Sequence, residues 1–270
     1  MPFAELSGRG IRLYHELRGE GPRLLYLGGT GGDLRRPPNA LEAMLASHFQ
    51  VLVLDQRGMG RSGKPDVPCT MADYAEDAAA LLDHVGWARV PVLGYSFGGM
   101  VAQELALRHA ERVERLVLLS TTAGGAGGAS YPLHELAGLS PEERALRMVE
   151  LGDRRRDARW RAGHSGMQRA LADEALAALR LGADEPGHAI GTRRQLEARR
   201  QHDTWERLPG LRLPIWVFGG KYDGIAAPEA VERLAARIPA ARLEFFEGGH
   251  LFFLQDPRAL ERIREALAGN

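Results

Sequence analysis

The sequence has 270 residues and a single cysteine, Cys69, so it cannot form an internal disulfide bond and fits a reducing compartment. It has 35 acidic and 35 basic side chains, and this zero net charge gives no reason to expect nucleic acid or an anionic membrane as a partner. No apolar run approaches the ~18 residues of a membrane-spanning helix. The first ten residues lack the apolar core of a signal peptide. We therefore expect a cytoplasmic protein with a small-molecule partner.

Two common ligand-binding patterns are also missing. None of the nine histidines forms a His-x-His or His-Glu-x-x-His pattern, so we expect no metal site. The glycine-rich stretch 28–33 is not followed by the Gly-Lys-Ser/Thr that completes a phosphate-binding loop. We therefore expect no cofactor, and we interpret this stretch as a turn that presents backbone N–H groups to an anion.

The most informative stretch is residues 90–100, with the sequence VPVLGYSFGGM. It predicts a short buried strand, a sharp turn centred on Ser96, and then a helix. Gly-x-Ser-x-Gly between a strand and a helix is a nucleophile elbow, in which the serine is held in a strained conformation with its hydroxyl above the sheet. Gly94 and Gly98 fit this turn, because a Cβ at either position would clash. Ser96 is therefore the candidate nucleophile.

Strand and helix patterns alternate on both sides of this elbow. The order predicts an α/β fold with a mainly parallel sheet, an antiparallel start and helices on both faces. Thr70 and Asp73 resemble a capping box at the start of one helix, and Gly86 fits its end. Strands are expected at 11–17, 24–27, 51–54, 90–93, 115–119, 215–218 and 243–246, and helices at 71–85, 97–108, 228–237 and 257–267.

The alternation stops at the GGAGG stretch, residues 124–128. Residues 131–207 show no convincing strand and hold helical patterns at 141–151, 173–181 and 192–207. We therefore expect a core of residues 1–123 and 211–270 and a helical cap of residues 124–210, with the glycines acting as a hinge. The arginine runs 154–156 and 199–200 are expected on solvated helix faces. Five apolar cap residues are expected to face the sheet or the ligand: Leu133, Leu136, Met148, Trp160 and Met167.

A serine hydroxyl needs a base, and two later residues are the candidates for completing such a site. His250 follows a predicted strand, in a Glu-Gly-Gly-His loop that can bring it over Ser96. Asp223 lies just beyond the strand at 215–218 and is the candidate acid, with an ordinary turn aspartate as the alternative. The strand at 115–119 is followed by Ser-Thr-Thr without a carboxylate, which favours Asp223. Asp55 and Arg57 are expected to hold their loop together rather than to catalyse.

Four motifs now combine: GYSFGG, DQRGMGRS, GGKYD and EGGH. In this order and spacing they resemble the α/β-hydrolase superfamily, in the capped subgroup that includes proline iminopeptidases, haloperoxidase-like esterases, enol-lactonases and C–C-bond hydrolases. The resemblance covers nearly the whole chain and implies an eight-stranded, mostly parallel sheet. It further implies Ser96 as nucleophile, His250 as base, Asp223 as its orienting acid, and the backbone N–H groups of Thr30 and Phe97 as the oxyanion hole.

Two positions depart from the family pattern. Many members begin the oxyanion loop with His-Gly, where this chain has Gly28 and Gly29, so the loop must be anchored differently. Members that cleave C–C bonds often have tryptophan after the histidine, and Leu251 here counts against that chemistry. The resemblance implies a serine hydrolase of a small ester, lactone or related acyl compound, working through an acyl-enzyme. A ligand receptor with slow turnover, an acyltransferase and a lyase are the alternatives, and a homodimer is compatible with the sequence.

Overall fold

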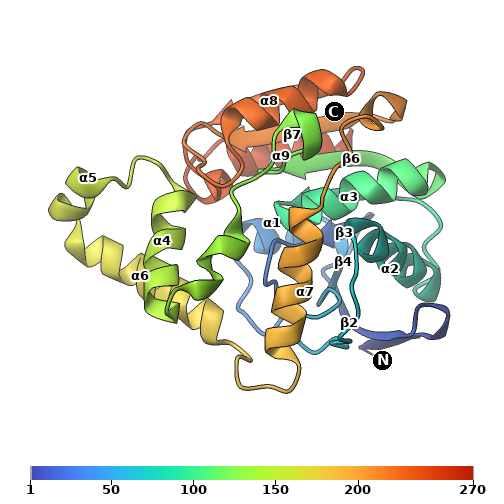
Figure 1. The fold of residues 1–270 in the computed structure, drawn as a ribbon. Coiled ribbons are helices and arrows are strands. Elements are labelled where there is room, and N and C mark those ends of the chain that lie inside the picture. Colours follow the sequence, from blue (N-terminus) through green and yellow to red (C-terminus); the bar gives the residue numbers. More distant parts are fainter. Residues whose placement is uncertain (1, 270) are drawn as a thin grey trace.

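The computed structural model describes residues 2–269 and arranges them around one eight-stranded sheet (Figure 1). The strand order is β1-β2-β4-β3-β5-β6-β7-β8. The β1–β2 and β2–β4 pairs are antiparallel, and every pair from β4–β3 onward is parallel. The predicted α/β fold with a mostly parallel sheet is therefore confirmed. The strands are β1 Phe3–Leu6, β2 Ile11–Arg18, β3 Arg23–Leu27, β4 Gln50–Leu54, β5 Val90–Tyr95, β6 Val113–Leu119, β7 Ile215–Gly220 and β8 Arg242–Phe246.

Helices cover both faces of the sheet. One face packs on α2 (Met71–His84), α3 (Phe97–Arg108) and α8 (Pro228–Arg237), and the other packs on α1 (Ala40–His48) and α9 (Ala259–Ala268). The central strands are apolar along their whole length because alternate side chains enter the two cores.

Local signals place several helix ends correctly. Thr70 and Asp73 form the predicted capping box of α2, and Gly86 follows its C-cap with a φ of 69°. Helix α1 had no counterpart among the predicted elements, although Asn39 and Glu42 form a capping box at its start. Only Leu41 and Leu45 of α1 are buried, so its apolar stripe is too short to stand out in the sequence.

Between β6 and β7 the described chain forms four α-helices and no strand beyond a single bridge between Gly124 and Asp203. In Figure 1, α5 and α6 lie farthest from the sheet, whereas α7 runs beside the loops of β3 and β4. No helix in residues 2–269 combines the length and the apolarity needed to span a membrane. The four helices are α4 Pro141–Gly152, α5 Ala158–Gly163, α6 Ser165–Arg180 and α7 His188–Arg200.

Two glycines of the stretch 124–128, Gly124 and Gly127, are buried in close contacts, and whether the stretch acts as a hinge stays a prediction. Gly124 has a φ of 71°, and a Cβ there would lie 1.8 Å from the carbonyl oxygen of His202. A Cβ at Gly127 would lie 2.4 Å from the ring of Trp205. These glycines allow the chain entering the insertion to pass close to the chain leaving it, a contact between residues about eighty positions apart that sequence composition does not reveal.

The apolar residues of the insertion divide into two groups. Leu133 and Leu136 are buried in a cluster with Leu151 and Ile225, and Met148 packs against it. The prediction is wrong for Met167, which is 57% exposed, and Trp160 instead stacks on the exposed ring of His164.

Candidate active site

Ser96 occupies the sharp turn between β5 and α3. Its φ of 53° and ψ of −114° are unusual for a residue with a side chain and require support from its surroundings. A Cβ at Gly94 would lie 2.5 Å from the carbonyl oxygen of Gly98, and one at Gly98 would lie 2.0 Å from that of Leu27. The hydroxyl of Thr121 donates a hydrogen bond of 2.9 Å to the Ser96 carbonyl oxygen. The turn therefore has the tight geometry that Gly-x-Ser-x-Gly predicts.

Three predicted side chains meet in one hydrogen-bonded row. Ser96 Oγ lies 2.9 Å from His250 Nε2, and His250 Nδ1 lies 2.8 Å from Asp223 Oδ2. Asp223 is fully buried, and its Oδ1 accepts the N–H groups of Ile225 at 2.7 Å and Ala226 at 2.9 Å. Ser96, Asp223 and His250 follow β5, β7 and β8, and residues that follow parallel strands meet at one edge of a sheet.

The loop that carries His250 is held from two sides. Ser120, in a left-handed conformation with a φ of 46°, donates its hydroxyl to the His250 carbonyl oxygen at 3.0 Å. The His250 N–H donates to the carbonyl oxygen of Gly152 at 2.6 Å. The Gly224 N–H donates to that of Leu151 at 3.0 Å. Two carbonyls at the end of α4 are thus satisfied by the loops of the histidine and the aspartate.

Sequence reasoning missed the positioning roles of Ser120 and Thr121. In the sequence they stand out only because the strand before them is followed by no carboxylate. A run of hydroxyl side chains directly after the buried strand β6 could have indicated these roles, because buried hydroxyl groups need a specific hydrogen-bond partner.

The two N–H groups predicted for the oxyanion hole come from different elements. Phe97 is the first residue of α3, so its N–H has no acceptor inside the helix. Within residues 2–269 the N–H of Thr30 also has no acceptor. The preceding residue, Gly29, lies against the elbow: a Cβ there would be 3.6 Å from Ser96 Cβ. The start of α3 adds a positive helix end at the same place.

The loop after β3 is anchored without the His-Gly pair of many relatives. The Gly31 N–H donates to Gln195 Oε1 at 2.7 Å, and the Leu34 N–H donates to Asp55 Oδ1 at 2.7 Å. Gln56 Nε2 donates to the Gly28 carbonyl oxygen at 3.0 Å. A residue of α7 and the loop after β4 therefore supply the anchoring that the departure at Gly28 requires.

Asp55 and Arg57 hold their loop together, as predicted. Asp55 is fully buried, accepts the Arg61 N–H at 2.8 Å in addition to that of Leu34, and has its pKa raised by burial. Arg57 Nε and Nη2 donate to the two carboxylate oxygens of Asp77 at 2.7 and 2.8 Å. Both charges are buried, and each is satisfied by the protein itself.

Two residues in or just after α7 are buried, and one of them contradicts a prediction. Arg199 was predicted on a solvated face, but it is 5% exposed and donates from Nη1 to the Tyr131 carbonyl oxygen at 2.7 Å. His202, just after the helix, is also buried, with Nε2 3.2 Å from the Thr122 carbonyl oxygen. Arg200 is exposed, as predicted. A run of two arginines does not show which of them turns inward, because that depends on the surface against which the helix packs.

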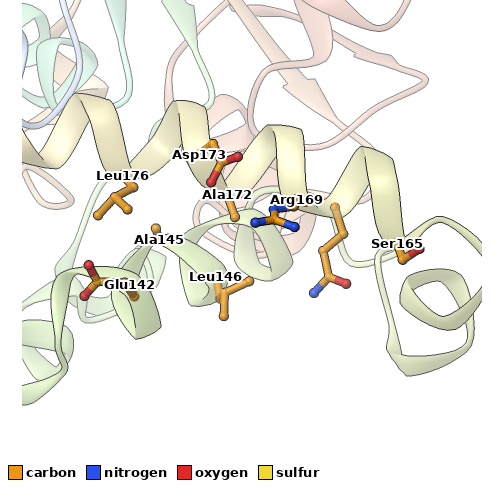
Figure 2. Close-up of a pocket in the computed structure, with 9 residues that line it drawn as sticks. Glu142, Ala145, Leu146, Ser165, Arg169, Ala172, Asp173 and Leu176 are labelled. Atoms are coloured by element: carbon orange, nitrogen blue, oxygen red, sulfur yellow. The ribbon is translucent and has the colours of Figure 1, made fainter.

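The cavity shown in Figure 2 is not lined by Ser96, Asp223 or His250. It has a volume of about 340 Å³ between α4 and α6, with Ala145 and Leu146 on one wall and Ala172 and Leu176 on the other. All of its lining residues belong to the insertion. Ser96 and His250 are only 6% and 7% exposed, so the row itself is almost closed to solvent.

The chain has clear relatives of known sequence and structure. A family model described as the alpha/beta hydrolase fold matches residues 22–257. A poly(3-hydroxyalkanoate) depolymerase of Ectopseudomonas oleovorans is 30% identical over 248 residues, which cover 89% of this chain and 82% of the depolymerase. The crystal structure of a hydrolase from Pseudomonas aeruginosa PA01 is 30% identical, with a TM-score of 0.75 and coverage of 99% and 98%. An enol-lactonase from Burkholderia xenovorans LB400 shares the fold at 24% identity, with a TM-score of 0.77 and coverage of 99% and 100%.

Proposed function

The chain belongs to the α/β-hydrolase family, and on that premise we propose that it is a serine hydrolase of a small ester, lactone or related acyl compound. The observation that carries the proposal is the row from Ser96 Oγ through the His250 ring to Asp223, with hydrogen-bonding distances of 2.9 and 2.8 Å. In this arrangement the serine hydroxyl is within reach of a base, and a carboxylate orients that base. Such an arrangement activates the hydroxyl for attack on a carbonyl.

In the first half of the reaction Ser96 Oγ attacks the carbonyl carbon of the substrate and His250 Nε2 takes its proton. Asp223 accepts the Nδ1–H of His250, which fixes the tautomer and stabilises the imidazolium that forms. The developing oxyanion is held by the N–H groups of Thr30 and Phe97, which have no other acceptor within residues 2–269. His250 then gives its proton to the leaving alcohol, and the acyl group stays on Ser96.

In the second half His250 removes a proton from a water molecule, whose oxygen attacks the acyl-enzyme. The same N–H groups hold the second oxyanion, and the proton returns from His250 to Ser96 as the acid leaves. The low exposure of Ser96 and His250 keeps bulk water from these charged states, which strengthens the hydrogen bonds that stabilise them.

The bond class rests on the relatives. One similar protein is an enol-lactonase and another is a depolymerase of a poly(3-hydroxyalkanoate). A carboxylic ester or lactone is the substrate type that is compatible both with these relatives and with a Ser-His-Asp triad. Leu251, in the place where C–C hydrolases often have tryptophan, is consistent with this choice.

The test uses the full chain with p-nitrophenyl acetate and a fluorophosphonate probe. Ser96→Ala should lower kcat by about 10⁴- to 10⁶-fold, because the members of such a triad act as a unit. The probe should label the peptide that contains Ser96 in the wild type and nothing in the variant. Activity that survives in Ser96→Ala would refute the proposal. A burst without steady turnover would indicate the receptor alternative, and a product formed without water would indicate the acyltransferase.

A further inference from the structure

Arg199 is a buried cation, and no carboxylate in the described part of the chain, residues 2–269, pairs with it. It is 5% exposed, and within residues 2–269 its Nε and Nη2 have no hydrogen-bond partner. Its one bond, from Nη1, goes to the neutral carbonyl of Tyr131. Burial lowers the pKa of Arg199 to about 10, so the group remains charged at neutral pH. An unpaired buried charge is costly, and such groups are otherwise paired with an opposite charge.

Arg57 shows what the free edge of Arg199 is suited to bind. Arg57 is similarly buried, and it uses the same two atoms, Nε and Nη2, to hold both oxygens of the Asp77 carboxylate. These two N–H groups are parallel and match the spacing of a carboxylate. Arg199 therefore presents a carboxylate-binding edge without a carboxylate, and a single negative charge would balance it.

The position of Arg199 connects this edge with the candidate active site. Gln195 lies one helical turn earlier on the same face of α7 and accepts the Gly31 N–H, next to Thr30 of the oxyanion loop. On the other side, Tyr131 accepts from Arg199, and its own N–H donates at 2.7 Å to the carbonyl oxygen of Ile225. The Ile225 N–H donates to Asp223. Arg199 is thus connected through α7 to the oxyanion loop, and through Tyr131 and Ile225 to the loop of Asp223.

Within residues 2–269, hydrogen-bond partners are also missing for three buried polar atoms: Gln195 Nε2 on α7, Thr30 Oγ1 on the oxyanion loop and Thr122 Oγ1 after β6. Buried polar atoms are almost always satisfied in a native protein, by other protein groups, by water or by a ligand, so these atoms are available to a polar group that binds beside them.

We propose that Arg199 binds a free carboxylate on the substrate, so that the acyl compound cleaved at Ser96 is a monoester or lactone of a dicarboxylic acid. This inference rests on the proposed function for the cleaved bond. The carboxylate would take the Nε and Nη2 edge of Arg199 in the way that Asp77 takes that of Arg57. A phosphate would bring a second negative charge into a buried site that offers one positive charge.

The experiment compares charged and neutral esters of equal length. The charged substrates are the monomethyl esters of succinic, glutaric and adipic acid. Their neutral counterparts of equal chain length are methyl butyrate, methyl valerate and methyl hexanoate. Hydrolysis is measured by titration of the released acid. For the best length, the wild type should show a kcat/KM about 10- to 100-fold higher for the monoester. In Arg199→Met this ratio should fall to about one, and Arg199→Lys should keep part of it because it retains the charge.

The control is Arg200→Met, the exposed neighbour on α7, which should keep the wild-type ratio. If Arg199 only holds the Tyr131 carbonyl, Arg199→Met lowers both substrates by the same factor, the ratio stays and the proposal is overturned. A wild type that hydrolyses these esters but prefers none of the three monoesters overturns it as well.

A binding measurement separates this proposal from the proposed function. Adipate or glutarate should raise the Tm of the wild type and of Ser96→Ala, but not that of Arg199→Met. If no ester is hydrolysed and this pattern holds, the carboxylate site stands and the assigned reaction fails. If esters are hydrolysed and neither diacid raises the Tm of Ser96→Ala, the reaction stands and the carboxylate site is refuted.

Discussion

Helices α6 and α7 belong to the same insertion but are embedded very differently. None of the 16 residues of α6 is buried, whereas α7, with 13 residues, buries Gly191, Gln195, Ala198 and Arg199. Helix α6 packs chiefly on α4, and α7 contacts the loops that follow β3, β4 and β6. The insertion therefore has an inner layer, α7 and the end of α4, which is bonded to the loops around Ser96, and an outer layer, α5 and α6. The outer layer packs chiefly on other insertion helices, and its bond to the core lies near the end of α6, where Arg36 Nη2 donates to the Ala178 carbonyl oxygen at 2.9 Å.

The inner layer of the insertion bonds directly to the loops of the candidate active site. Carbonyls of Leu151 and Gly152 at the end of α4 accept N–H groups from the loops of Asp223 and His250. Gln195 on α7 anchors the loop of Thr30. The inner layer thus positions residues of the core, and we expect changes in it to alter activity and stability together. Changes in the outer layer should alter neither by much.

The largest contrast is expected from one substitution made in each helix. A Cβ at Gly191 of α7 would lie 1.9 Å from the Gly58 carbonyl oxygen, and a Cβ at Gly166 of α6 meets nothing within 4 Å. Gly191→Ala should therefore lower the free energy of unfolding by about 3 kcal/mol, because backbone must move to relieve the overlap. Gly166→Ala should be neutral or stabilise by about 0.5 kcal/mol. Urea unfolding measures both, and equal effects would erase the distinction between the layers.

A second contrast concerns pH and two histidines. Burial lowers the pKa of His202 from 6.5 to about 4, and its Nδ1 has no acceptor for a proton within residues 2–269. The unfolded chain therefore binds this proton more readily, so stability is lost as the pH falls from about 6.5 to about 4. The loss from this group amounts to at most about 3 kcal/mol.

His202→Gln should remove this part of the pH dependence, because glutamine can still donate to the Thr122 carbonyl oxygen. His164→Gln, at an exposed site between α5 and α6, should leave the profile as in the wild type. Unfolding by urea at several pH values tests this, and parallel profiles for His202→Gln and the wild type would contradict it.

A third contrast compares two glutamines. Gln195→Met leaves the half-buried Gly31 N–H without its acceptor, at a cost of about 1 kcal/mol. Because the loop of Thr30 loses its anchor, kcat/KM for p-nitrophenyl acetate should fall by about 10- to 100-fold. Gln168 of α6 forms no side-chain hydrogen bond within residues 2–269, so Gln168→Met should stay within about 0.5 kcal/mol and keep its activity. Full activity of Gln195→Met would show that the loop of Thr30 keeps its conformation without the hydrogen bond to Gln195.

The smallest effect is expected in the outer layer. Arg180 of α6 pairs with Glu142 of α4, with side chains 61% and 54% exposed. Exposed ion pairs add little, so Arg180→Gln should lower the free energy of unfolding by less than about 0.5 kcal/mol and leave ester hydrolysis unchanged. A loss above about 1 kcal/mol that persists at high salt would show that α6 is held more firmly than its exposure indicates.

Much of the molecule was predictable because its signals are local. The elbow at Ser96 depends on glycines two residues away on either side, and the caps of α2 depend on residues within one turn. The continuous apolar strands indicated burial on both faces and hence a mostly parallel sheet. Chain order also supported the candidates Asp223 and His250, since both lie directly after strands and such positions converge at one edge.

Only the tertiary structure decided which residues hold the site together and which arginine of α7 is buried. Ser120 reaches the loop of His250 over 130 positions, and Gln195 reaches Gly31 over 164. Arg199 and Arg200 are adjacent and chemically identical, yet one is buried and the other exposed. Periodicity shows which residues share a helix face, but the surface that this face meets is made by segments far away in the chain. For that reason the sequence by itself determined the fold class and the candidates for the reaction, while the packing of α7 decided what surrounds them.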